Sequence, residues 1–427
     1  MSLAGKEQGF MRTVLSHRLF KNTSALVVLQ LFNYLAPLIV LIHLTRVLGI
    51  ELYGVVAFSM GMIQFSFVIM DFGFSLSATK KISQHRERQK YIARLLGSIL
   101  AIKFFLFLLI AGVIVLYIFK STRYTDYRLL FLLTLLPILG QGYQPTWFFS
   151  GLERMSFVAA AGVVSRVVFV IFVLLFVRGP EGYLLVPIGN GIAQLTATVL
   201  SFVVVSKLGF RIKIPTLADL KYTLKMTAGY FVSRLSVSAY MNSGVLVMGV
   251  FSAPAATAVY SLAEQLYRVM QSAFLPINQS LFPFMVRERR FDLWVKLTLI
   301  CLFIALAGSI LGYYLSPILI PLVFGLGWDA VLSVLQIFFI AILVHVAAVF
   351  FGYPLGAIVN KLDVPNRSVV YGAFVYLLGV AAFIALDKIS ALMLAALMVV
   401  AEFIVFLNRA ISLIPLAKSK GLMGSAR

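Results

Sequence analysis

Apolar stretches of membrane-helix length recur along almost the whole chain, and short polar connections separate them. Crossing the hydrocarbon core of a bilayer takes about 20 apolar residues in helical conformation. The pattern therefore predicts an all-α polytopic membrane protein with twelve transmembrane helices. We expect them approximately at residues 25–44, 53–78, 92–119, 129–149, 157–177, 183–205, 227–251, 257–285, 293–315, 331–358, 369–386 and 391–413.

The positions of the basic residues predict the orientation of these spans. With a cytoplasmic N-terminus, most of the 36 Lys and Arg residues fall on the inner side. Cytoplasmic loops carry such an excess in membrane proteins. We therefore expect both termini to be cytoplasmic. The outer side would then carry Arg46, Lys120, Arg123, Arg128, Arg178 and Lys388.

The longest polar connection, Lys207–Lys225, lies near the middle of the chain. It divides the twelve spans into an N-terminal bundle, residues 1–206, and a C-terminal bundle, residues 207–427. An even number of spans in each half gives both halves the same orientation, as in parallel repeats. Val56–Ser59 and Ala258–Ser261 read alike at matching places in the two halves. The pattern predicts two six-helix bundles related by pseudo-twofold symmetry.

Composition narrows the class further. Charged residues make up 12% of the chain and hydrophobic residues 61%, which excludes an ordinary soluble domain. The net charge of +21 does not indicate nucleic acid, because the basic residues cluster at helix ends, where they contact anionic lipid headgroups. A single cysteine excludes an intramolecular disulfide, and the four histidines are scattered. We expect no cofactor, no metal and no cleavable signal.

Charged residues within spans mark the candidate site. A charge at the bilayer centre costs at least about 2.5–3.5 kcal/mol, so it usually faces a cavity. Arg234 lies in the seventh span, with Tyr230 and Asn242 on its face at helical spacing. Glu264 and Arg268 follow in the eighth span at i, i+4, where they face a ligand or neutralise each other.

Other spans add further candidates. Arg166 lies near the centre of the fifth span and Lys103 within the third, where its long stem could also snorkel. Polar residues at helical spacing form stripes in two more spans. These are Gln30 and Asn33 in the first and Asn190 and Gln194 in the sixth.

The spans also hold three acids, Asp71, Glu264 and Glu402, against five basic residues. Each acid either binds a coupling ion (a proton or sodium) or balances an arginine. The excess is cationic, so we expect a cavity that attracts an anion. Guanidinium groups bind phosphate bidentately. A lipid-linked phosphate or pyrophosphate suits such a cavity.

Three segments give the chain a resemblance to a known family. They are LTRVLGIELYGVVAFS with MDFGFSLSATKKIS, then PILGQGYQPTWFFSGLERM, then YFVSR with AVYSLAEQLYR and LPINQSLFPFM. The chain resembles the O-antigen flippases, in the polysaccharide-export branch of the MOP (multidrug/oligosaccharidyl-lipid/polysaccharide) exporter superfamily. By position, Arg234, Glu264 and Arg268 match family motifs. Pro145, Trp147, Gly151 and Glu153 match another motif, whose role the sequence does not reveal.

The resemblance implies alternating access through a central cationic cavity in a bacterial inner membrane. The substrate would be an undecaprenyl-pyrophosphate-linked O-antigen repeat unit, moved from the cytoplasmic to the periplasmic leaflet. No nucleotide motif occurs, so an ion gradient or the membrane potential is the expected energy source. The polymerase and the chain-length regulator of the same pathway are candidate partners.

Two alternatives remain at this point. One is a MOP-type exporter of another substrate, such as a drug; cationic drugs would favour a surplus of cavity acids. The other is a membrane glycosyltransferase or polymerase acting on lipid-linked sugars. Such an enzyme would be expected to carry a large extramembrane loop or a cluster of acids, and the sequence has neither.

Overall fold

The computed structural model describes the backbone of residues 3–419. It describes side chains from Ala36 to Ser419, except those at positions 232, 233, 236, 237 and 239. All regular secondary structure in this part of the chain is helical. The predicted site residues Gln30 and Asn33 lie outside the described residues.

The helices are α1 (Leu3–Asp71), α2 (Phe74–Gln84), α3 (Gln89–Lys120), η1 (Thr125–Tyr127), α4 (Arg128–Leu133), α5 (Leu135–Tyr143), α6 (Thr146–Gly151), α7 (Met155–Phe176), η2 (Pro180–Leu184), α8 (Leu185–Lys207), α9 (Leu217–Met241), α10 (Gly244–Phe251), α11 (Pro254–Glu288), α12 (Phe291–Phe324), α13 (Ala330–Phe350), α14 (Tyr353–Val359), α15 (Asp363–Ala385) and α16 (Ala391–Ser419).

The first two predicted spans fall within one element, α1, which contains a sharp break. Gly49 has φ 71° and ψ 176°, a conformation that a residue with a side chain rarely adopts. The chain therefore reverses at Gly49, between the two predicted spans.

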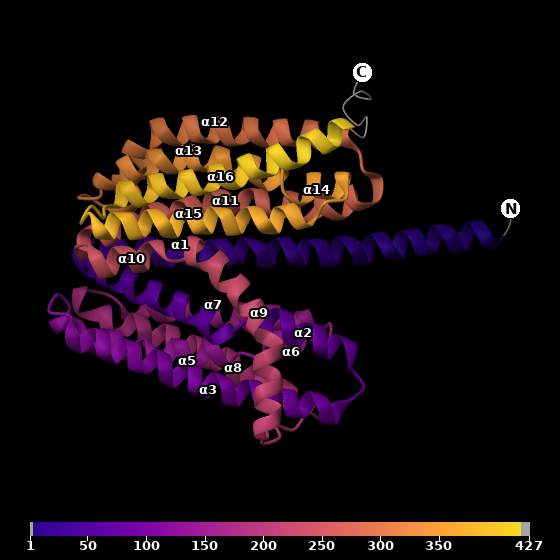
Figure 1. The fold of residues 1–427 in the computed structure, drawn as a ribbon, viewed down its shortest axis with the longest axis horizontal. Coiled ribbons are helices and arrows are strands. Elements are labelled where there is room, and N and C mark those ends of the chain that lie inside the picture. Colours follow the sequence, from indigo (N-terminus) through magenta and orange to yellow (C-terminus); the bar gives the residue numbers. More distant parts are fainter. Residues whose placement is uncertain (1–2, 420–427) are drawn as a thin grey trace.

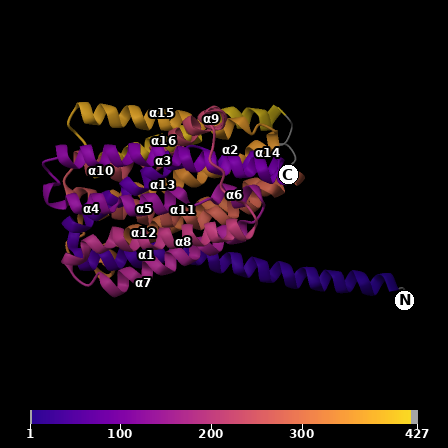
Figure 2. The ribbon, with the colours of Figure 1, turned by 90° about the horizontal axis from the view of Figure 1, so that it is seen from below.

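The helices form two groups (Figure 1). The first helix group comprises α2–α8 and the second comprises α11–α16, while α1 and α10 lie between them. Helix α1 packs against α11 of the second group and against α5 and α7 of the first. Helix α9 crosses from one group to the other, since it packs against α2 and α3 and also against α15 (Figures 1 and 2).

Eight helices in the described part of the chain are long and apolar enough to cross a membrane. Their outward surfaces are apolar; Phe105, Leu116 and Phe303 have exposed fractions of 63%, 70% and 71%. Such surfaces are stable only against lipid. The protein is a multi-pass membrane protein. The eight are Ala36–Gln84, Gln89–Lys120, Met155–Phe176, Pro180–Lys207, Phe291–Phe324, Ala330–Val359, Asp363–Ala385 and Ala391–Ser419.

The count of eight differs from the predicted twelve for identifiable reasons. The first two predicted spans lie on either side of the break at Gly49 and are counted together in Ala36–Gln84. The predicted span 129–149 is divided among α4, α5 and α6. The predicted seventh span is broken between α9 and α10, and the eighth, in α11, carries Glu264 and Arg268. The twelve crossings and their pseudo-twofold relation stay predictions.

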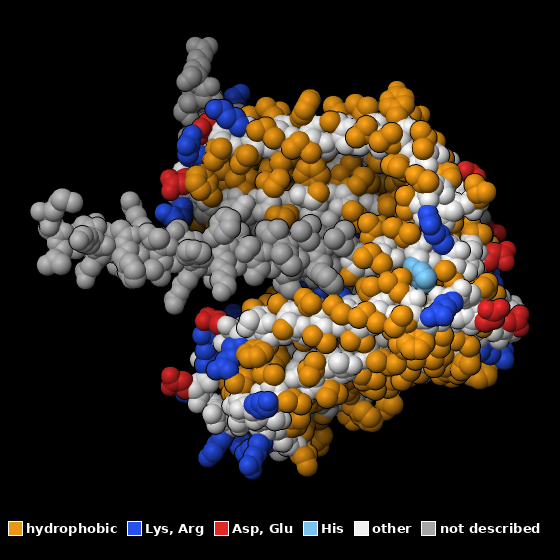
Figure 3. Space-filling model, turned by 180° about the vertical axis from the view of Figure 1, so that it is seen from behind, with side chains coloured by type: hydrophobic (Ala, Val, Ile, Leu, Met, Phe, Trp, Pro, Cys, Tyr) orange, Lys and Arg blue, Asp and Glu red, His pale blue; other side chains and the backbone are white. Residues whose placement is uncertain are grey.

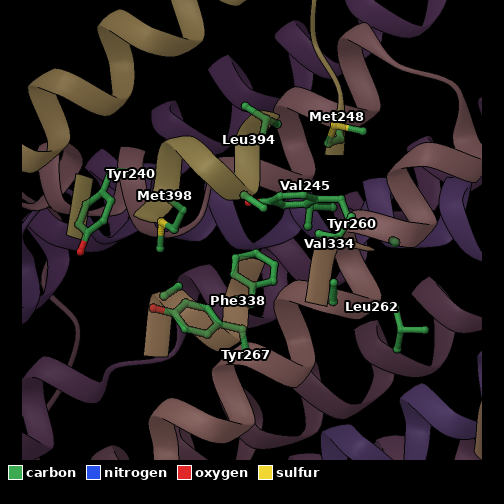
Figure 4. Close-up of a cluster of buried hydrophobic side chains, with 14 of the residues drawn as sticks. Tyr240, Val245, Met248, Tyr260, Leu262, Tyr267, Val334, Phe338, Leu394 and Met398 are labelled. Carbon is green, nitrogen blue, oxygen red and sulfur yellow. The ribbon is translucent and has the colours of Figure 1, made fainter. Parts of the chain in front are cut away.

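Aromatic side chains fill the interior of the second group (Figure 4). The ring of Tyr267 on α11 stacks on that of Phe338 on α13, with centroids 4.8 Å apart and planes 9° apart. Tyr260 meets the same phenylalanine edge-on at 6.1 Å. These rings fix α11 against α13 and thereby fix the helix that carries Glu264 and Arg268.

Lys and Arg side chains gather at the end of the molecule where α2 and α16 end (Figure 3). At the opposite end, guanidinium groups hold helix C-termini. Arg46 Nε donates to Val323 O at 2.6 Å, near the end of α12. Arg123 donates to Ser252 O at 2.7 Å, just after α10. Cations stabilise the carbonyls that a helix leaves free at its C-terminus.

The motif at Pro145–Glu153 docks α6 onto α2. Thr79 Oγ1 donates to Trp147 O at 3.2 Å, and Arg86 Nε donates to Gly151 O at 3.1 Å. Arg86 also pairs with Glu153, and this hydrogen bond lowers the pKa of the exposed Glu153 carboxyl. These contacts give the motif a structural role that its sequence did not reveal.

Candidate functional site

A cavity of about 430 Å³ lies between the two helix groups. Helix α1 forms its apolar floor with residues such as Val40, Leu41 and Leu44. Side chains from α5, α7 and α8 form one wall, and Asn242, just after α9, forms the other with side chains from α10 and α11. Its polar lining residues are Tyr53, Gln64, Gln141, Arg166, Asn190, Gln194, Asn242, Ser261, Glu264, Gln265 and Arg268.

Close packing of α5 on α8 shapes the first wall. A Cβ at Gly140 would lie 2.7 Å from the backbone nitrogen of Leu195, so only glycine permits this approach. Thr198 Oγ1 donates to Gly140 O at 2.6 Å and ties the two helices together. Asn190 and Gln194 lie one turn apart on α8, so both face the cavity.

Arg166 enters the cavity from α7 and is half-buried. Its guanidinium lies over Gly162, where a Cβ would approach Nη1 to 3.3 Å. Within the described residues, it has no ion-pair partner and no hydrogen bond. A guanidinium without a protein partner beside a cavity is free to bind an anion.

Arg268 on the opposite wall instead has partners for both of its terminal guanidinium nitrogens. Nη2 donates to Met241 O at 2.8 Å and lies 3.3 Å from Glu264 Oε1. Nη1 donates to Asn242 Oδ1 at 3.2 Å. The predicted i, i+4 pairing with Glu264 is therefore present, and a helix C-terminus supplies the remaining acceptors.

Arg234, Tyr230 and Asp71 do not line the cavity. Arg234 is 46% exposed, and its Nε lies 3.9 Å from Asp71 Oδ2. Asp71 also accepts a hydrogen bond from Ser75 Oγ at 2.8 Å. Tyr230 is half-buried beside Gly73, so this group joins α9 to the turn between α1 and α2.

Lys103 is also away from the cavity. It is 2% exposed, its Nζ donates to Gly142 O in the last turn of α5, and it lies 5.9 Å from the Phe74 ring centroid. Its charge stabilises a helix end.

Glu402 belongs to a buried network in the second group. Its Oε1 lies 3.0 Å from His345 Nδ1 and accepts from the Tyr240 hydroxyl at 3.2 Å. Gln271 Nε2 lies 3.2 Å from the same histidine nitrogen. Glu402 therefore has two polar partners within the fold, Tyr240 and His345.

Sequence reasoning did not single out Arg409, Gln141 or Gln265. Arg409 lies inside the apolar run of α16, but its position near the predicted end of a span made it look like an ordinary inner-side cation. Gln141 stands between the two glycines of a Gly-Gln-Gly sequence, and that small-residue context is the signal that could have identified it. Gln265 follows Glu264 directly, and this position beside the charged pair is the signal that could have identified it.

The excess of basic over acidic groups in the cavity is therefore smaller than the sequence predicts. Its described charged lining residues are Arg166, Arg268 and Glu264. Since Glu264 pairs with Arg268, one guanidinium remains without a counter-charge.

Comparisons with known proteins agree with this architecture. A family described as "Polysaccharide biosynthesis protein" matches residues 19–289. The chain is 23% identical over 324 residues to an Escherichia coli (strain K12) protein named "Putative O-antigen transporter", covering 74% of this chain and 78% of that protein. A Shigella dysenteriae protein of the same name is 25% identical over 318 residues, covering 71% of this chain and 78% of that one.

Solved structures share the fold. The lipid II flippase MurJ in an inward closed conformation has a TM-score of 0.74 and 13% identity, covering 94% of this chain and 90% of that one. An inward-facing multidrug resistance MATE family transporter of the MOP superfamily has a TM-score of 0.62 and 13% identity, covering 90% of this chain and 96% of that one. The resemblance inferred from the sequence is confirmed: the chain belongs to the polysaccharide biosynthesis protein family, with relatives named as O-antigen transporters and the fold of MOP-superfamily flippases.

Proposed function

We propose that the protein is a flippase for polyprenyl-pyrophosphate-linked O-antigen repeat units. It moves them from the cytoplasmic to the periplasmic leaflet of a bacterial inner membrane, with both of its own termini in the cytoplasm. The observation that carries this proposal is Arg166, a guanidinium that lines the cavity without a protein partner. A pyrophosphate supplies the acceptors that such a group lacks. The names of the relatives support the same substrate class.

Alternating access between two six-helix bundles, residues 1–206 and 207–427, is the proposed mechanism. The cavity lies between the two helix groups, where a relative movement would change its exposure. At the end of the molecule away from the C-terminal end of α16, Arg46 binds a carbonyl of α12 and Arg123 binds a carbonyl just after α10. These contacts hold the helices together at that end in the present state. They would have to break for a sugar to leave on that side.

An ion gradient or the membrane potential is the proposed energy source. Moving one charge through the membrane potential provides about 2.3 kcal/mol per 100 mV. Asp71, Glu264 and Glu402 are the candidate sites for a coupling proton or sodium ion, although each has a polar partner in this structure. The polymerase and chain-length regulator are proposed partners at the outer surface.

Disrupting the gene in its own host tests the proposed function. Lipid-linked repeat units should accumulate on the inner leaflet, and surface polysaccharide should fall. The wild-type gene should restore export, whereas an Arg166→Ala gene should not, although the protein inserts. Normal surface polysaccharide in the disrupted strain would overturn the proposal.

A further inference from the structure

Six carboxamide side chains line the cavity, and four of them come from α1, α5 and α8. Gln64 comes from α1, Gln141 from α5, and Asn190 and Gln194 from α8. No hydrogen bond joins any of the four to another group in the described part of the chain. Gln64 is exposed and the other three are half-buried, so their hydrogen-bond partners are water or a ligand in the cavity. A carboxamide offers two donor hydrogens and an acceptor oxygen, which complements a sugar hydroxyl or acetamido group.

The carboxamides of α5 and α8 are held on a rigid base. The backbones of the two helices touch at Gly140, where a Cβ would lie 2.8 Å from Gln194 Cβ. Gln141 follows directly, so its backbone is fixed beside that of Gln194. Gly191, between Asn190 and Gln194, packs on Leu136 of α5, where a Cβ would lie 2.7 Å from Leu136 Cβ. Binding groups on tightly packed helices keep their positions better than groups on loops.

The charge of the cavity limits what can lie beside these carboxamides. Arg166 is its one described lining cation without a partner, since Glu264 engages Arg268. A pyrophosphate diester already carries more negative charge than one guanidinium neutralises. A sugar carboxylate would find no free cation among the described lining residues. Desolvating an unpaired charge is costly, so it would be disfavoured here.

We propose that Gln141, Asn190 and Gln194 form a subsite for uncharged sugars beside the pyrophosphate held by Arg166. The inference rests on the proposed function and adds the chemical class of the saccharide. The carboxamides hydrogen-bond the hydroxyl and acetamido groups of a neutral sugar. An acidic sugar at the same place is rejected because its carboxylate stays unpaired.

Binding measurements with defined lipids test the carboxamides. The probes are polyprenyl pyrophosphate alone and polyprenyl pyrophosphate carrying an N-acetylglucosamine disaccharide. The combined Gln141→Leu and Gln194→Leu changes should weaken binding of the disaccharide lipid about tenfold, since hydrogen bonds of about 1 kcal/mol are lost. Binding of the bare lipid should not change. Equal weakening of both lipids, or of neither, would overturn the subsite.

Matched variants separate binding from folding. Gln84→Leu changes an exposed carboxamide at the end of α2 and should leave both affinities unchanged. If the leucine variants fail to fold, Gln141→Asn and Gln194→Asn keep the amide and withdraw it by one methylene. The same selective loss is then expected, and its absence would overturn the subsite.

Transport into proteoliposomes tests the charge limit. The neutral disaccharide lipid should move about tenfold faster than the same lipid ending in glucuronic acid. Equal rates, or faster movement of the glucuronic acid probe, would overturn the proposed preference. If the wild-type protein neither binds nor moves any pyrophosphate lipid, the proposed function fails, and this inference fails with it.

Discussion

Arg409 and Arg166 are both arginines within apolar helices, yet their surroundings differ completely. Arg409 is 7% exposed, and its three guanidinium nitrogens donate to Ser368 Oγ, Ala348 O and Pro365 O at 2.8, 2.6 and 3.2 Å. Arg166 lines the cavity and has no such acceptor among the described residues. The first arginine holds helices together, whereas the second is free for a ligand.

Arg268 lies between these two extremes. It lines the cavity, but Glu264, Asn242 and the Met241 carbonyl occupy its donors. An arginine within a membrane helix can bind a ligand only with the hydrogen-bond donors that the fold leaves unsatisfied.

Arg409→Ala should have the largest effect on stability. It leaves the carbonyls of Ala348 and Pro365 without donors and removes a positive charge near Glu402. Breaking a buried charged network costs about 3–5 kcal/mol. The thermal unfolding temperature of the purified protein should fall sharply.

Arg367→Ala is the control for that variant. Its side chain is 71% exposed and pairs with Asp363 across one helical turn. Exposed pairs contribute little, so its unfolding temperature should stay near that of the wild type. Equal losses from both variants would contradict the assignment of Arg409 as a structural arginine.

Arg166→Ala should remove most transport and leave stability almost unchanged. No hydrogen bond or ion pair among the described residues is lost, so the free energy of unfolding should stay within about 0.5 kcal/mol. Transport of the disaccharide lipid should fall at least about tenfold, since a charge-assisted hydrogen bond contributes about 1.5–3 kcal/mol. Arg211→Ala, in an exposed linker, is the transport control. Wild-type transport by Arg166→Ala would contradict the assignment of Arg166 as a ligand-binding arginine.

Arg268→Ala should have an intermediate effect, and Glu264 decides its size. Alone, the change leaves the Glu264 carboxylate without its partner at 3.3 Å. The double variant with Glu264→Gln removes both charges and should recover part of the loss. A double-mutant cycle of unfolding temperatures and transport rates measures this coupling. Purely additive effects would show that the pair does not interact.

Arg234→Ala should have the smallest effect on transport, less than about threefold. Its side chain is 46% exposed, and its 3.9 Å contact with Asp71 is long for an ion pair. Its place in the seventh span and in a family motif makes this arginine a candidate site residue from the sequence. A transport loss as large as that of Arg166→Ala would show that the substrate reaches α9 outside the present cavity.

Hydrophobic periodicity was sufficient to predict an all-helical membrane protein, because apolar length reports directly on the bilayer. It could not predict the division at Gln144–Pro145 between α5 and α6, which depends on local backbone geometry. The break at Gly49 does lie between the first two predicted spans.

The candidate site was predictable in part. Helical spacing placed Asn190 and Gln194 on one face and paired Glu264 with Arg268, and all four line the cavity. Depth in the membrane could not distinguish the roles of Lys103 and Arg166. Lys103 donates a hydrogen bond to the Gly142 carbonyl, whereas Arg166 has no such partner among the described residues. That difference arises from contacts between helices distant in sequence, and no pattern within one span records it.

The affinity of the purified protein for the disaccharide lipid tests the central claim most directly. The account predicts that Arg166→Ala weakens binding at least about tenfold with an unchanged unfolding temperature. It also predicts that Arg409→Lys lowers the unfolding temperature while the folded protein binds with wild-type affinity. Wild-type affinity in Arg166→Ala, or a selective loss of affinity in Arg409→Lys, would contradict the account.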